Sequence, residues 1–119
     1  MFTLTSAHQY YLYNGRTDMR KSFDGLCGLV RSKLHRDPMS GEVFVFINRR
    51  CNQIKLLNWE QGGFILYYKR LEAGTFELSS FDTSQSCCHI QWSELVMMTE
   101  GISMKNLHYR KRFSLKKSG

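Results

Sequence analysis

The spacing of apolar residues in the first third of the chain predicts a strand followed by a helix. Residues 8–13 (HQYYLY) favour a short strand, and the Asn14-Gly15 pair favours a turn because both residues tolerate positive φ. Apolar side chains then recur at intervals of three and four, which predicts an amphipathic helix with one face against a core. The predicted face consists of Met19, Phe23, Leu26, Cys27, Val30 and Leu34.

Signals for the start and the end of this helix flank the apolar pattern. Thr17 or Asp18 is expected to cap the first turn, and Pro38 to end the helix because proline disfavours helical geometry in the preceding residue. Gly25 and Gly28 lie inside the pattern, where each costs about 1 kcal/mol relative to alanine. A close approach of the helix to a sheet is the expected compensation.

The middle of the chain shows strand patterns separated by turn residues. Glu42–Ile47 has apolar side chains on both faces, which predicts a central strand. A loop at Asn48–Asn52 then presents Arg49 and Arg50 at a hairpin tip. Further antiparallel strands are expected at Gln53–Trp59, Phe64–Leu71 and Thr75–Leu78, with turns at Gly62-Gly63 and Gly74. After a polar loop over 79–86, Trp92–Glu100 predicts a short helix that Gly101 stops.

These elements predict an α+β fold: an antiparallel β-meander of about four to five strands, one main amphipathic helix and a short C-terminal helix. The 119 residues suffice for one hydrophobic core, so residues 1–104 are expected to form a single domain. Residues 105–119 are expected to form a basic C-terminal arm.

The net charge of +7 is concentrated in that arm. It contains Lys105, Arg110, Lys111, Arg112, Lys116 and Lys117 and no acidic residue, which leaves the first 104 residues nearly neutral. A basic arm on a nearly neutral domain is typical of proteins that bind polyanions such as DNA, because lysine and arginine release counterions from phosphates. A merely solubilising tail is the alternative.

Basic residues within the domain fall into three groups that suit phosphate contact. The candidate nucleic-acid-binding residues are Arg16, Arg20 and Lys21 at the start of the first helix, Arg49, Arg50 and Lys55 on the hairpin, Lys69 and Arg70 on the third strand, and Arg110, Lys111 and Arg112 in the arm. The alternative is a set of solvated charges paired with Asp18, Asp24 and Glu72.

Signals for catalysis and for cofactors are weak. Cys87, Cys88 and His89 are adjacent and so are poorly spaced for one tetrahedral metal ion, and we expect no metal site. Asp18 and Asp24 are six residues apart, which does not place them on one helical face for two-metal nuclease chemistry. The chain also has no phosphate-binding loop of the G-x-x-x-x-G-K-[ST] type, and we expect no cofactor.

The start of the chain has no pattern typical of a signal peptide, and no stretch of about 18 apolar residues suggests a membrane span. We therefore expect a cytoplasmic protein with reduced cysteines, and association with the nucleoid is a further expectation.

A longer motif resembles a known family. Residues 15–26 (GRTDMRKSFDGL) resemble the G-x-T-D-M-R-K-x-F-D-G-L signature of the TnpB-type accessory protein of bacterial insertion-sequence family sixty-six. Further blocks agree in order from about residue 10 to residue 102, among them Asn48-Arg49-Arg50 and Tyr68-Lys69-Arg70-Leu71-Glu72. This family is distinct from the larger RNA-guided nuclease that shares the TnpB label.

The resemblance implies an accessory factor that acts beside a separate transposase, and it assigns no catalytic residue. The residues of the motif with a structural role are expected to be Gly15, Thr17, Asp18, Phe23, Asp24 and Gly25.

Three hypotheses follow for the activity of the chain. The first is a noncatalytic protein that binds the DNA of the insertion-sequence ends, the element-encoded transposase, or both. The second is a protein-interaction module that acts only through the transposase. The third is a metal-dependent nuclease that depends on Asp18 and Asp24.

Overall fold

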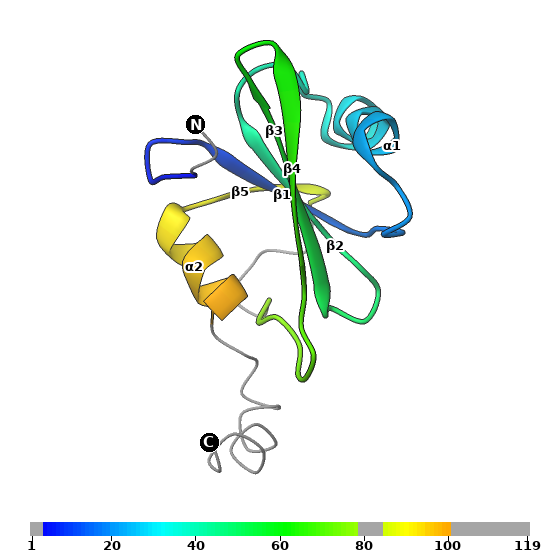
Figure 1. Ribbon diagram of the computed structural model, residues 1–119, viewed down its shortest axis with the longest axis vertical. Helices are drawn as coiled ribbons and strands as arrows, with labels where there is room; N and C mark the ends of the chain where they lie inside the picture. Colours follow the sequence, from blue (N-terminus) through cyan, green and yellow to red (C-terminus); the bar gives the residue numbers. More distant parts are fainter. Residues whose placement is uncertain (1–3, 79–84, 101–119) are drawn as a thin grey trace.

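A five-stranded sheet with one helix on each face forms the protein (Figure 1). The computed structural model describes residues 4–78 and 85–100. The elements are β1 (Tyr10–Arg16), α1 (Phe23–Leu29), the π-helical segment η1 (Val30–Leu34), β2 (Val43–Ile47), β3 (Gln53–Glu60), β4 (Gly63–Arg70), β5 (Cys87–Ile90) and α2 (Trp92–Glu100). The predicted α+β class, with a main helix and a short C-terminal helix, is confirmed.

The strand order is β4-β3-β2-β1-β5. β2, β3 and β4 form the predicted antiparallel meander, and β1 pairs in parallel with β2. A parallel pair needs a crossover connection, which α1 and η1 supply. β5 then returns antiparallel to the other side of β1.

The two faces of the sheet bury separate apolar clusters. Tyr10 and Val45 lie in the cluster beneath α2, together with Leu95 and Met98 of that helix. Phe44 and Phe46 lie in the cluster beneath α1, with Leu26 and Val30. All five residues of β2 are buried, as expected of a central strand covered on both sides.

Two local predictions for the first third of the chain are wrong. Asn14 and Gly15 do not form a turn but continue β1, where the register with β2 shifts between Leu12 and Arg16. This irregularity lets β1 extend beyond the position at which the sequence suggested a stop. The predicted core residue Phe23 is 41% exposed because it stands at the first position of α1, outside the buried stripe.

The predicted helix cap and glycine contacts are also corrected. α1 begins only at Phe23, after Ser22, so Thr17 and Asp18 are too far upstream to cap it. The helix ends at His35, whose left-handed φ of 56° terminates it before Pro38. Gly28 faces open space rather than the sheet, whereas a Cβ at Gly25 would contact the side chain of Lys21.

The fourth strand of the meander was assigned to the wrong residues. Thr75–Leu78 forms no strand, although the N–H of Phe76 donates to the Cys51 carbonyl (2.8 Å) and its side chain is buried. The additional strand is β5, in a segment whose polar and cysteine-rich sequence gave no strand pattern.

The basic arm at 105–119 and the helix stop at Gly101 lie outside the described residues. Among the helices that are described, none combines the length and the apolar character needed to cross a membrane.

Candidate nucleic-acid interface

The predicted basic segments meet at one end of the sheet. The parallel register places Arg16 opposite Ile47, and the N–H of Thr17 donates to the Ile47 carbonyl (2.8 Å). The antiparallel register places Arg70 opposite Gln53, so β4 ends beside the same β2–β3 loop. The chain leaving β1, the β2–β3 loop and the end of β4 therefore lie side by side (Figure 1).

Hydrogen bonds of Asn48 shape the loop that presents the two adjacent arginines. Its side-chain oxygen accepts the N–H groups of Asn52 and Gln53, both at 2.9 Å. Its side-chain amide also donates to Oδ1 of Asn52 (2.7 Å). The loop is thereby fixed from within, and Arg49 and Arg50 project into solvent at its tip.

A compact turn around Asp18 shapes the segment between β1 and α1. The Asp18 carboxylate accepts the backbone N–H of Arg20 (2.9 Å) and three bonds from its guanidinium (3.1, 3.0 and 2.6 Å). The hydrogen bonds from Arg20 lower the pKa of Asp18 to about 2. Since both side chains are exposed, the pair contributes little to stability, and its effect is to hold the conformation of the turn.

Lys55 of β3 connects the β2–β3 hairpin to the turn around Asp18 through hydrogen bonds. Its side chain is only 6% exposed, and its ammonium donates to the backbone carbonyls of Met19 (2.9 Å) and Lys21 (2.7 Å). The ammonium also lies 4.7 Å from the centre of the Tyr68 ring. Lys55 was predicted to contact phosphate, but it is buried and its ammonium donates to two backbone carbonyls inside the protein, so we treat it as a positioning residue.

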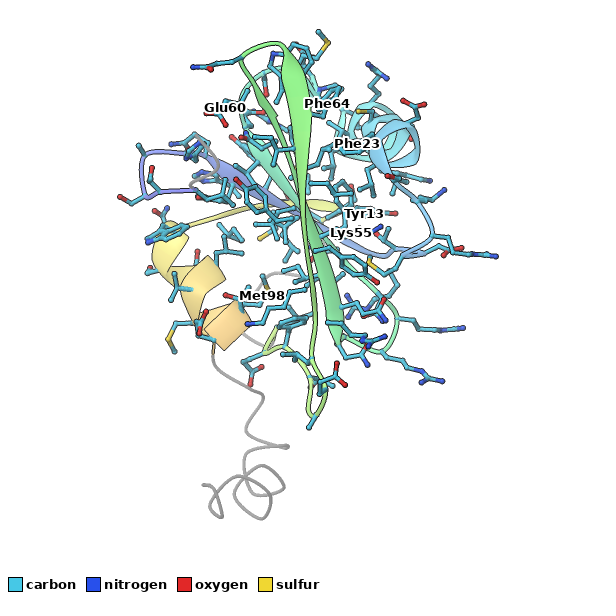
Figure 2. The ribbon with its side chains drawn as sticks, viewed as in Figure 1. Tyr13, Phe23, Lys55, Glu60, Phe64 and Met98 are labelled. Atoms are coloured by element: carbon cyan, nitrogen blue, oxygen red, sulfur yellow. The ribbon has the colours of Figure 1, made fainter. Side chains whose placement is uncertain are left out.

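Gly15 allows an aromatic side chain to cover the end of β1. A Cβ at Gly15 would lie 2.2 to 2.7 Å from atoms of the Tyr13 ring, too close for any other residue without movement. Tyr13 in turn packs edge-on against Phe46 at a centroid distance of 6.2 Å. Figure 2 shows Tyr13 and Lys55 on the same side of the sheet. Gly15 thus fits the structural role that the motif implied.

The other motif residues divide between buried and exposed positions. Thr17 is buried at the point where β1 leaves the sheet, whereas Phe23 and Asp24 are exposed in the first turn of α1. An open hollow lies between the turn and the loop, and it is lined by Thr17, Asp18 and Met19 on one side and by Asn48, Arg49 and Arg50 on the other.

The predicted basic residues are not all on this surface. Arg16, Lys21, Arg49 and Arg50 are exposed at the shared end of the sheet, and none of them has an ion-pair partner within residues 4–78 and 85–100. We call these four residues the basic end. Arg20 is paired with Asp18, and Arg70 lies 3.4 Å from Glu72. Arg110, Lys111 and Arg112 lie outside the described residues.

Lys69 lies on the face of the sheet that carries α2. It pairs with Ile54, which belongs to the cluster beneath α2, and its ammonium donates to the Thr99 carbonyl (3.3 Å). The bond to Thr99 holds the Lys69 ammonium against α2, so Lys69 is not counted with the basic end.

A partly buried ion pair was missed by the sequence interpretation. The guanidinium of Arg36 donates to both carboxylate oxygens of Glu42 (2.9 and 2.8 Å) and lies 3.9 Å from the centre of the Tyr11 ring. These hydrogen bonds lower the pKa of Glu42. Arg36 and Glu42 flank the turn at Asp37–Ser40. A separation of six residues is not typical of any helical or strand pairing, so the sequence did not reveal the ion pair.

The residues considered for metal chemistry are dispersed. Cys87 packs with the cluster beneath α1 and Cys88 with the cluster beneath α2, because they are neighbours on a strand. Burial raises the pKa of the Cys87 thiol. Within the described parts of the chain, no three histidine, cysteine or acidic side chains come together as a metal site would require.

The geometry defines a small α+β protein that presents one basic end. The profile of the family described as "IS66 Orf2 like protein" matches residues 8–109. The chain therefore belongs to this family.

Two curated relatives come from Sinorhizobium fredii (strain NBRC 101917 / NGR234). "Uncharacterized protein y4jC" is 42% identical over 59 residues, which cover 50% of this chain and 50% of that protein. "Uncharacterized protein y4hO" is 37% identical over 67 residues, which cover 56% of this chain and 57% of that protein. The match thus spans about half the length of these relatives. No solved structure matches significantly.

Proposed function

We propose that this protein assists transposition without catalysis, by binding the DNA of the insertion-sequence ends through the phosphates that contact its basic end. The observation that carries the proposal is that the segment from Arg16 to Lys21 and the loop with Arg49 and Arg50 meet at one end of the sheet, where residues of both line one hollow. Four exposed cations that form no ion pair within the described residues attract a polyanion and release its counterions on binding.

The arrangement favours phosphate contact over the reading of bases. Arg16 ends β1 and the other three basic residues lie in turns, so none of the four is carried by a helix that could enter a major groove. Contacts of this kind position a protein on DNA and are largely insensitive to sequence. Selection of the insertion-sequence ends then falls to the transposase.

The proposal predicts a strong and specific effect of salt. Binding of labelled terminal-repeat DNA should weaken steeply with salt concentration, and the Arg49→Ala/Arg50→Ala protein should bind about five- to tenfold more weakly. If both arginines contact phosphate, the slope of log K against log salt should fall by about 2. Fluorescence anisotropy titrations at several salt concentrations measure both quantities.

A charge-matched control is available on η1. Arg31→Ala/Lys33→Ala removes the same two charges, and both residues are exposed on the segment that leads into the opposite end of β2. This variant should retain the slope of the unaltered protein. Equal slopes for the two double variants, or binding that does not depend on salt, would reject the proposal.

A second candidate function is docking on the transposase. An apolar groove of about 400 Å³ lies between α2 and the outer strands, lined among others by Leu56, Tyr67, Trp92 and Val96. A groove of this kind suits an apolar segment of the transposase. A pull-down with purified transposase that survives nuclease treatment, and that Val96→Asp abolishes, would favour this function over direct DNA binding.

A further inference from the structure

One edge of the sheet is long, regular and uncovered by any described strand. β4 stands at the end of the strand order, and all eight of its residues pair with β3 without a register shift. None of its residues is buried. The opposite edge, β5, has only four residues, which is the usual way in which proteins limit an exposed edge.

The β3–β4 turn determines which backbone groups of β4 point outward. Gln61 and Gly62 have φ values of 48° and 85°, the two positive values of a type I′ hairpin turn. Glu60 and Gly63, which flank this turn, therefore form a hydrogen-bonded pair, and hydrogen-bonded pairs alternate along the ladder. The N–H of Leu71, which donates to the Asn52 carbonyl (2.8 Å), fits this alternation.

The even-numbered residues consequently present their backbone N–H and C=O groups away from β3. These residues are Phe64, Leu66, Tyr68 and Arg70. No proline, bulge or charged side chain interrupts β4 before Lys69. An edge that lacks such features is a template for another strand.

We infer that β4 pairs in an antiparallel manner with β4 of a second copy of this chain, about a two-fold axis through Tyr67. In this register Leu66 faces Tyr68 and Phe64 faces Arg70, so every outward backbone group meets another. Ile65 faces Lys69 on the side of α2. Facing residues lie on the same side of the joined sheet, as antiparallel pairing requires.

The charges on β4 favour a second copy of this strand as the partner, and they favour antiparallel over parallel pairing. The two cations of β4 stand at one end of the strand, so an antiparallel copy carries them to the opposite end. There Arg70 meets the ring of Phe64, a favourable cation–π arrangement, and Lys69 meets Ile65. Parallel pairing would instead place Lys69 against Lys69 and Arg70 against Arg70, which is destabilising.

The inferred dimer points its two basic ends in opposite directions along one continuous sheet. Figure 2 shows Glu60 and Phe64 at the end of β3 and β4 away from the β2–β3 loop, so the antiparallel copy adds its basic end on that side. A dimer of this form can hold two DNA segments at once. This consequence rests on the proposed function, whereas the pairing itself does not.

Sedimentation equilibrium of the full chain over a concentration series tests the pairing. The unaltered protein should approach twice its mass of 14.0 kDa. Leu66→Pro removes an outward N–H that β3 does not use, and it should yield monomers. A constant monomer mass of the unaltered protein, or a dimer that persists in Leu66→Pro, would overturn the inference. If the unaltered protein is a monomer and Leu66→Pro abolishes its binding to the transposase, the β4 edge binds the transposase. That result would also overturn the inferred dimer.

A pair of matched variants tests the register and guards against misfolding. Ile65→Lys places a lysine opposite Lys69 of the second copy, whereas Ile65→Glu places a carboxylate there. Both remove the same half-buried side chain. Over the two equivalent sites, the dimer dissociation constant of Ile65→Lys should exceed that of Ile65→Glu by about tenfold or more. Equal dimer dissociation constants for the two variants would contradict the register. This outcome does not depend on whether the protein binds DNA.

Discussion

Replacing Lys55 by methionine should lower the free energy of unfolding by about 3 kcal/mol, because hydrogen bonds from a charged donor contribute about 1.5–3 kcal/mol each and methionine burial restores part of the loss. The substitution leaves the carbonyls of Met19 and Lys21 without the ammonium that joins them to β3. Urea unfolding followed by circular dichroism measures the change.

The same substitution should weaken DNA binding although the Lys55 side chain is buried. Without the tether, the turn that carries Lys21 is no longer held beside Arg49 and Arg50. Lys33→Met makes the same chemical change at an exposed position of η1 and should alter stability by no more than about 0.5 kcal/mol. Undiminished stability of Lys55→Met would contradict the role assigned to this residue.

Replacing Arg36 by alanine should cost about 2 kcal/mol at neutral pH. It leaves the mostly buried carboxylate of Glu42 without its partner and removes the cation above the Tyr11 ring. The cost is below that of a fully buried pair because the Arg36 side chain is 35% exposed. Arg31→Ala, at an exposed helical position, should have little effect.

The cost of Arg36→Ala should depend on pH in a defined direction. Folding lowers the pKa of Glu42 below its ordinary value of 4.5, chiefly through the hydrogen bonds from Arg36. The stabilisation is therefore present above pH 4.5 and is lost as the pH falls through the pKa of the folded state. As Glu42 is protonated, the unfolding free energies of the two proteins should approach each other, and only the contribution of the contact between Arg36 and Tyr11 should remain. A difference that stays constant would show that the ion pair is not its source.

The parts of the fold that the sequence predicted are those set by local pattern. β2, β3 and β4 follow from short apolar runs separated by glycine and asparagine turns, and α2 matches its predicted bounds of Trp92–Glu100. The parallel pairing of β1 with β2 could not be predicted this way, since it depends on contacts between segments about thirty residues apart. β5 was missed because the Cys87–Ile90 segment pairs by tertiary contact and has little strand pattern of its own.

The candidate site was predictable in composition but not in geometry. The sequence identified Arg16, Lys21 and the arginine pair of the hairpin, and the register of the sheet brings them to one end. It could not show that Lys55 is buried or that Lys69 faces α2, because one residue of register decides the face of each side chain.

The most direct test of the proposed basic end is a two-dimensional ¹H–¹⁵N NMR titration of the full chain with terminal-repeat DNA. Amide shifts should concentrate at residues 16–21 and 48–53 and disappear together at high salt. Shifts confined to α2 and the adjoining groove, or no shifts at low salt, would contradict the claim that these two loops form the DNA-binding surface.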